Sequence, residues 1–90
     1  MKYKITYLEN VIKKDLPALS PPIKKSITRA INERIAAEPM KVGTPLLYEF
    51  KGHRRLQVSD YRIIYRVDII ECEVTITSIK HRKESYRKKN

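Results

Sequence analysis

The chain has 90 residues, 41% of them hydrophobic and 33% charged, and this length allows one domain spanning residues 1–90. Twenty lysines and arginines against ten aspartates and glutamates give a formal net charge of +10, which indicates a polyanionic partner, either nucleic acid or an acidic protein. One cysteine and two histidines exclude an internal disulfide and a four-cysteine zinc site, so no metal and no other cofactor is expected.

The N-terminal residues predict a strand. Residues 3–8, YKITYL, alternate β-branched and aromatic residues with polar ones, as a half-buried strand does. This alternation differs from the apolar core of a signal peptide, and the sequence contains no run of about 18 apolar residues. Because the single cysteine also fits a reducing compartment, we expect a cytoplasmic protein without membrane contact.

Two helices are predicted next. Residues 9–19 place apolar side chains at near-helical spacing, and Pro17 disfavours the last turn. Residues 20–38 predict a longer helix, with Ser20 as N-cap, Pro21 in the first turn and Pro39 at the end. The charged residues of this helix are interpreted as a solvated face: Lys24, Lys25, Arg29 and Glu33.

The second half of the chain predicts a β-meander. A loop at residues 40–45 contains glycine and proline. Three or four strands follow, at residues 46–50, 54–58, 61–67 and 72–79. The order of an N-terminal strand, two helices and an antiparallel β-meander predicts an α+β fold with the helices packed on one sheet face.

The segment HRRLQVSDYRIIYRV, residues 53–67, carries four arginines in a β-prone stretch. A two-residue turn at Ser59-Asp60 would pair Val58 with Tyr61, and side chains would then alternate between two faces. The further predicted pairs are Gln57 with Arg62, Leu56 with Ile63, and Arg55 with Ile64. The predicted core face consists of Leu56, Val58, Tyr61, Ile63, Tyr65 and Val67. The face left open by the helices collects Arg55, Gln57, Arg62, Ile64 and Arg66.

The like charges on the open face indicate an anionic ligand. Neighbouring cations repel at about a few tenths to 1 kcal/mol per cross-strand pair, so stability gives no reason to gather them. The planar guanidinium binds phosphate in a bidentate manner. Two arginines have a structural alternative: Arg66 could pair with Asp68 or Glu73 on a neighbouring strand, and Arg54 could simply be exposed.

The basic tail KHRKESYRKKN, residues 80–90, places His81, Arg82 and Tyr86 directly after the last predicted strand. A chain end at this position can fold over an open sheet face. A tyrosine near RNA could stack on a base or transfer a proton. The alternative is a solvated tail without a site.

The hairpin LQVSDYRIIYRV followed by HRKESYR, behind a strand and two helices, resembles the RelE/ParE superfamily of bacterial toxins from type II toxin–antitoxin systems. The similarity spans nearly the whole chain, and its most specific parts are DYRIIY and HRKESYR. RelE members cleave mRNA on the ribosome and ParE members inhibit DNA gyrase, so the shared fold does not decide the activity. The RelE-type interpretation is favoured here.

For a RelE-type member the resemblance implies a metal-independent endoribonuclease. The ribose 2′-hydroxyl attacks the adjacent phosphate and leaves a 2′,3′-cyclic phosphate and a 5′-hydroxyl. Carried over by position, Arg62 would stabilise the phosphorane, Arg82 would lie at the leaving-group side, and Tyr86 would stack on or deprotonate the nucleotide. Arg55 occupies the first of two alternating basic positions on the preceding strand.

The sequence departs from the family pattern at the second alternating position, where Gln57 replaces the usual lysine or arginine. Lys51, Arg54 or His81 could compensate for the missing charge. Some relatives use a C-terminal histidine as general acid or base, and many others keep one there as a structural residue. The residues expected to bind RNA without being catalytic are Lys51, Arg54, Gln57, His81, Lys83 and Arg87.

The resemblance also implies the partners. These are an antitoxin whose acidic, partly disordered segment covers the basic face, the ribosome and mRNA, with DNA reached only indirectly through the antitoxin. The expected function is therefore that of a toxin that inhibits translation as a ribosome-dependent mRNA endoribonuclease. The alternative, which Gln57 favours, is a ParE-like DNA gyrase inhibitor without catalytic activity.

Overall fold

The computed structural model describes residues 2–86, apart from the side chains of residues 85 and 86, and its strands form a single mixed sheet. The order across the sheet is β1-β5-β4-β3-β2. Three long antiparallel strands make up its centre, namely β3 (His53–Val58), β4 (Tyr61–Asp68) and β5 (Glu73–His81). The edge strand β1 (Lys4–Tyr7) runs parallel to β5, and the short β2 (Thr44–Pro45) pairs antiparallel with β3.

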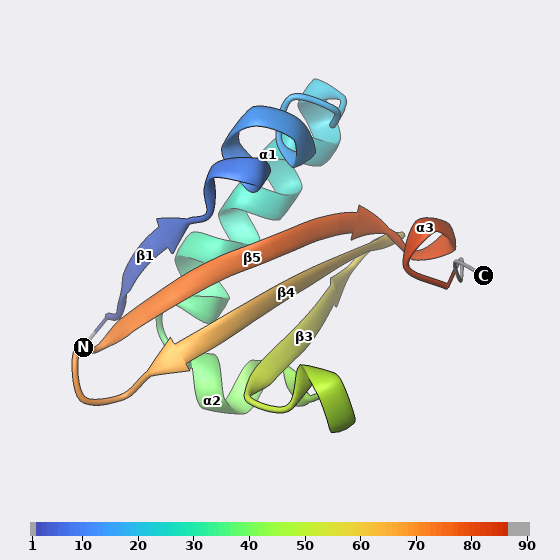
Figure 1. The fold of residues 1–90 in the computed structure, drawn as a ribbon. Coiled ribbons are helices and arrows are strands. Elements are labelled where there is room, and N and C mark those ends of the chain that lie inside the picture. The colour runs from blue at the N-terminus through green and yellow to red at the C-terminus, as the bar shows by residue number, and fades with distance from the viewer. Residues whose placement is uncertain (1, 87–90) are drawn as a thin grey trace.

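The larger helical segments cover one face of this sheet (Figure 1). They are η1 (Val11–Asp15), α1 (Pro21–Ala30) and η2 (Ile31–Ile35), which continues α1 without a break. Apolar side chains of the helices, of the turn between η1 and α1, and of the three central strands form the core: Val11, Leu19, Ile27, Ala30, Ile31, Ile35, Leu56, Ile63, Tyr65, Val74, Ile76 and Ile79. The α+β prediction with helices on one sheet face is confirmed.

Both predicted helices are present, and each ends in a wide π-type turn. The amide of Leu16 donates to the carbonyl of Val11 (2.9 Å), and that of Ala36 donates to Ile31 (2.9 Å). The regular part of the first helix ends at Asp15, before Pro17, whose ring lacks the donor that a further turn needs. The charged residues predicted to be solvated on the second helix are exposed. None of the helices in the described part has the length and apolar character that a membrane span requires.

The prediction of a loop and a strand between residues 40 and 50 is wrong. The preceding helix ends at Ile35, and Pro39 begins a new one, α2 (Pro39–Val42), because its fixed φ suits a first helical position. A short 3-10 helix, η3 (Tyr48–Phe50), replaces the strand predicted at residues 46–50. Tyr48 has φ 58°, a left-handed conformation incompatible with a strand, and its side chain is 89% exposed.

The predicted register of the arginine-rich hairpin is confirmed. Val58 pairs with Tyr61, and Gln57 pairs with Arg62 across β3 and β4. Ser59 adopts φ 56°, which closes the two-residue turn with the twist that a hairpin requires. Residues predicted on the core face are buried or packed against the core. The opposite face is therefore the one on which Arg55, Arg62 and Arg66 lie.

Candidate functional site

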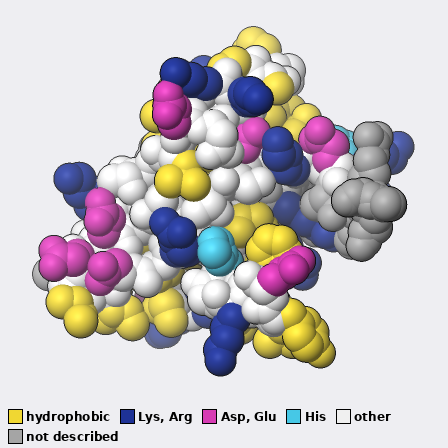
Figure 2. All heavy atoms as spheres, viewed as in Figure 1, with side chains coloured by type: hydrophobic (Ala, Val, Ile, Leu, Met, Phe, Trp, Pro, Cys, Tyr) yellow, Lys and Arg dark blue, Asp and Glu magenta, His cyan; other side chains and the backbone are white. Residues whose placement is uncertain are grey.

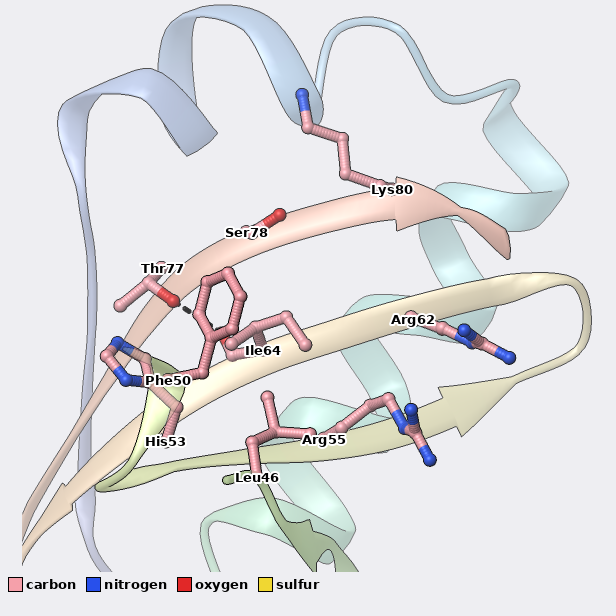
Figure 3. Close-up of a pocket in the computed structure, with 9 residues that line it drawn as sticks. All are labelled: Leu46, Phe50, His53, Arg55, Arg62, Ile64, Thr77, Ser78 and Lys80. Carbon is pink, nitrogen blue, oxygen red and sulfur yellow. Dashed lines mark hydrogen bonds between the residues drawn. The ribbon is translucent and has the colours of Figure 1, made fainter. Parts of the chain in front are cut away.

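A groove of about 490 Å³ lies on the sheet face opposite the helices. Alternate residues of β3 and β4 form its floor, since Arg55 pairs with Ile64 and both side chains point away from the core. The residues that line it are Leu46, Phe50, His53, Arg55, Arg62, Ile64, Thr77, Ser78 and Lys80 (Figure 3).

A β-bulge in β5 shapes one wall of the groove. Ile64 pairs with Ser78 and the next residue, Tyr65, pairs with Ile76, so Thr77 is the extra residue. The hydroxyl of Thr77 donates to the carbonyl of Ile64 (3.2 Å). The bulge turns two consecutive residues, Thr77 and Ser78, towards the groove.

The opposite wall is the turn between β2 and β3, which contains η3. The amide of Leu46 donates to the carbonyl of His53 (2.9 Å) and closes this turn at its base. Gly52 has φ 95°, a conformation that residues with a Cβ rarely adopt, and it returns the chain to β3. Phe50 is thereby held against His53, with ring centroids 6.4 Å apart and an interplanar angle of 88°.

Two guanidinium groups lie together at one end of the groove. Arg55 and Arg62 extend towards the 59–60 turn, the end of the sheet beside which α3 (Arg82–Tyr86) stands (Figures 1 and 3). Arg62 is only 8% exposed, so an anion beside it would be attracted through a medium less polarisable than bulk water. No aspartate or glutamate is among the described residues that line the groove. This end of the groove is suited to bidentate phosphate binding.

The other basic residue of the groove, Lys80, turns towards the helices. Its ammonium lies 3.0 Å from the buried carboxylate of Asp15 in η1. Lys80 therefore closes an edge of the groove, and its charge is already partly balanced.

Arg54 lies on the other face of β3 and holds α2 in place. Its guanidinium donates to the carbonyls of Met40 (2.8 Å) and Gly43 (2.6 Å). The paired Tyr65 donates its hydroxyl to Pro39 (2.7 Å). Burial raises the pKa of Tyr65 above its ordinary value, and the neighbouring Arg54 opposes that rise. Arg54 is therefore not simply exposed, as the structural alternative supposed, and its contact with RNA remains a prediction.

Three other residues of the open face and its edges lie outside the groove. Gln57 is exposed, and its amide donates to the carbonyl of Ser59 (3.2 Å). Lys51 is exposed in the turn before β3. Arg66 is also exposed, and within the described residues it forms no ion pair with Asp68 or Glu73.

The residues predicted at the C-terminus lie either near the groove end formed by Arg55 and Arg62, called here the guanidinium end, or on the side of the sheet that the helices cover. The Arg82 amide donates to the carbonyl of Asp60 (2.7 Å), and its Nε lies 3.8 Å from the Asp60 carboxylate, so α3 is tied to the hairpin turn. His81 packs edge-on against Tyr61 at 5.2 Å and accepts from the amide of Lys83 (3.1 Å), which places it away from the groove. Lys83 is exposed. Tyr86 belongs to α3, but its side chain and the whole of Arg87 lie outside the described residues.

The predicted site includes only Arg55 and Arg62 of the nine residues that line the groove, and the two aromatic residues His53 and Phe50 are among those it lacks. His53 shares its face with Arg55, two positions further along β3, so the same alternation would have found it. No sequence signal indicated that Phe50 would reach the groove, because residues 46–50 were expected to form a strand. The face seen in Figure 2 carries a central histidine with hydrophobic, basic and acidic side chains near it. Within the described chain, no three His, Cys, Asp or Glu side chains are grouped to hold a metal ion.

Comparison with known proteins gives consistent matches. A family model described as the ParE toxin of type II toxin-antitoxin system, parDE, matches residues 8–86. Toxin RelG of Mycobacterium tuberculosis is 30% identical over 88 residues, which are 98% of this chain and 100% of that protein. In the toxin-antitoxin complex RelBE2 of M. tuberculosis, one chain matches with TM-score 0.84 and 27% identity, over 90% of this chain and 99% of that one. The isolated E. coli RelE toxin matches with TM-score 0.72 and 15% identity, over 88% and 83% of the two chains.

Proposed function

Because this chain belongs to the ParE toxin family of type II toxin–antitoxin systems, within the RelE/ParE superfamily, we propose that it is an endoribonuclease that cleaves mRNA on the ribosome. The ribose 2′-hydroxyl loses its proton and attacks the adjacent phosphorus. The bond from phosphorus to the 5′-oxygen breaks, and that oxygen takes up a proton. The products are a 2′,3′-cyclic phosphate and a 5′-hydroxyl, and translation stops because the message is cut.

The observation that carries this proposal is the pair of guanidiniums at one end of the groove. Arg55 and Arg62 come from neighbouring strands and extend in the same direction (Figure 3). The phosphorane formed during the attack carries more negative charge than the starting phosphodiester, so fixed cations stabilise it more than the ground state. Two planar donors in one partly dry site supply both the charge and the geometry.

The remaining catalytic roles fall to α3. Arg82 lies at the leaving-group side, where its charge stabilises the departing 5′-oxygen. Tyr86 stacks on the nucleotide or takes the proton of the 2′-hydroxyl. The support for these roles is the position of α3, which is anchored by the bond from the Arg82 amide to Asp60 (2.7 Å) beside the guanidinium end.

The ribosome contributes the positioning of the substrate. A reaction that needs an in-line approach of the 2′-hydroxyl gains much of its rate from orientation. The described groove residues are rich in cations and offer no carboxylate as a base. The isolated protein is therefore expected to cut naked RNA only weakly.

The partner that neutralises the protein is an antitoxin. The related M. tuberculosis structure is a complex of a toxin with its antitoxin. The net charge of +10 favours an acidic antitoxin segment that covers the basic face and competes with RNA there. Contact with DNA would then occur only through the antitoxin.

The second candidate function is inhibition of DNA gyrase without catalysis. The observation that favours it is the description of the matching family, which is that of a ParE toxin. The groove would then be a surface for protein contacts. The substrate, RNA or gyrase, is what an experiment must decide.

The deciding experiment maps the 5′ ends of cellular mRNA after brief expression of the protein, together with the supercoiling of a reporter plasmid. An endoribonuclease gives new 5′-hydroxyl ends within translated reading frames and leaves supercoiling unchanged. A gyrase inhibitor gives relaxed plasmid and no new ends. The second result would overturn the proposal.

A further inference from the structure

The groove has two chemically different ends. The guanidiniums of Arg55 and Arg62 lie at the end beside the hairpin turn, and Phe50 and His53 lie at the other (Figure 3). Between them, Ile64 supplies an apolar floor. A phosphate needs only the first end, so the second is available for another part of the ligand.

The Phe50 end presents an aromatic face to the groove. Phe50 is 52% exposed, although apolar side chains of this size usually lie in the core. The turn that contains η3 holds it in place, and its edge-to-face contact with His53 fixes its orientation. An ordered, half-exposed aromatic ring over a strand is the platform on which proteins stack nucleobases.

His53 adds a polar group at the same end. Its Nδ1 atom is buried and has no hydrogen-bond partner among the described residues, which is unfavourable for a polar atom. Arg66 occupies the paired position on β4, and Arg55 lies two residues further along β3. Because this atom is buried, a ligand in the groove would bond to Nδ1 only if the imidazole turned towards it.

We propose that the groove holds a single nucleotide, with its phosphate at Arg55 and Arg62 and its base against Phe50 and His53. His53 and Arg55 are two residues apart on one strand, so their Cα atoms lie about 7 Å apart, and the guanidinium of Arg55 extends further from the aromatic end (Figure 3). The groove volume of about 490 Å³ is in the range of pockets that hold a small ligand such as one nucleotide. The arginines cannot distinguish bases, since phosphate contacts carry no sequence information. Phe50 and His53 are therefore the specificity-determining residues. This inference rests on the proposed function for RNA as the substrate.

Binding to the isolated protein tests the inference without requiring cleavage. Nucleoside 3′-monophosphates, inorganic phosphate and unphosphorylated nucleosides are titrated separately, and the shifts of assigned amide resonances are followed by NMR. The monophosphates are expected to shift residues at both ends of the groove. Phosphate alone should shift the Arg55 and Arg62 region, and nucleosides should shift the Phe50 and His53 region.

The variants separate stacking from a general loss of structure. Phe50→Ala is expected to weaken nucleotide binding by about five- to a hundredfold, while phosphate binding stays as in the unmodified protein. Phe50→Leu, which keeps an apolar side chain without a ring, is expected to weaken it in the same direction. Tyr48→Ala is the matched control, because Tyr48 lies in the same turn, is 89% exposed and does not line the groove. His53→Ala should reduce the differences in affinity among the four nucleotides.

The inference is overturned if Phe50→Ala binds nucleotides as tightly as the unmodified protein, or if the shifts lie outside the groove. Its failure is distinct from failure of the proposed function. If nucleotides bind in the groove but the protein does not cleave mRNA on ribosomes, the proposed nuclease activity is wrong and the nucleotide-binding site stands. If Phe50→Ala and His53→Ala both cleave mRNA on ribosomes at the same codons as the unmodified protein, the nuclease activity stands. Phe50 and His53 then do not determine base specificity.

Discussion

Asp15 and Lys80 join the first helix to the last strand through one buried carboxylate. The Lys80 ammonium lies 3.0 Å from Oδ1 of Asp15, while Oδ2 accepts the amide of Ile79 at 2.9 Å. The Asp15 side chain is 2% exposed and that of Lys80 is 43% exposed. The bulge after Ile76 brings Ile79 and Lys80 to this position, so the same irregularity shapes the groove and anchors η1.

Replacement of Asp15 should therefore cost stability. Asp15→Ala leaves the Ile79 amide without its acceptor and is expected to lower the free energy of unfolding by about 1–3 kcal/mol. Lys80→Met should also cost about 1–3 kcal/mol, because it leaves the buried carboxylate of Asp15 without its counter-ion. Urea unfolding of the two single variants and the double variant measures both values and their coupling. An unchanged free energy of unfolding in Asp15→Ala would show that the carboxylate does not hold the helix.

Loss of either groove arginine should abolish most of the proposed activity. Arg55→Ala and Arg62→Ala each remove one of the cations that stabilise the phosphorane. The rate of cleavage on ribosomes is expected to fall by about 10²- to 10³-fold in each. Arg62→Lys keeps the charge without the planar fork and should retain only part of the rate. Arg66→Ala is the matched control, since Arg66 lies on the same strand, is exposed and does not line the groove.

Full activity in a folded Arg55→Ala, Arg62→Ala double variant would contradict the assignment of the groove as the active site. Because Arg62 is 8% exposed, the folding of each variant has to be checked by its thermal midpoint. Growth inhibition on expression gives the same comparison in cells.

The hairpin could be predicted because two signals agreed. The polar Ser59-Asp60 pair marked the turn, and the alternation of side chains fixed which residues share a face, so the register from Val58 and Tyr61 onwards is confirmed. Local patterns are reliable where a two-residue turn leaves a single register.

His53 was missed because its strand was predicted to begin one residue late. Side-chain alternation places His53 on the same face as Arg55, but His53 lies before the predicted start of the strand. The position of Phe50 in the groove and the role of Arg54 depend on contacts between distant segments, which a local sequence pattern does not show. The bonds from Arg54 to Met40 and Gly43 join segments 14 and 11 residues apart. The apolar run at residues 46–50 was read as a strand, but most of its side chains are exposed.

Gln57 is expected to be dispensable. Its side chain is exposed and bonded to its own turn, outside the groove. Gln57→Ala should therefore leave the cleavage rate within about twofold, as for an ordinary surface substitution. A large loss in this variant, measured on ribosomes beside Arg55→Ala, would show that the position acts directly on the substrate.

Gly43 is expected to tolerate no side chain. A Cβ on Gly43 would collide with the Tyr65 hydroxyl and would approach the carbonyl oxygen of Arg55 to 3.0 Å. Gly43→Ala should lower the free energy of unfolding by about 1–3 kcal/mol, the usual cost of overpacking. Tyr65→Phe removes the colliding oxygen, so the same glycine substitution should cost less in that background. Equal costs in both backgrounds, measured by urea unfolding, would contradict this steric cause.

Stability should fall at alkaline pH because of Tyr65. Burial raises the pKa of Tyr65 in the folded protein above the value of about 10 that a tyrosine has in an unfolded chain. Above pH 10 the unfolded state releases this proton first, so the free energy of unfolding decreases as the pH rises. Burial also raises the pKa of Tyr7, which acts in the same direction. Urea unfolding between pH 8 and 11 should show a smaller decrease in Tyr65→Phe than in the unmodified protein. The exposed Tyr48→Phe is the control and should leave the decrease unchanged; an identical decrease in Tyr65→Phe would show that the buried hydroxyl does not cause it.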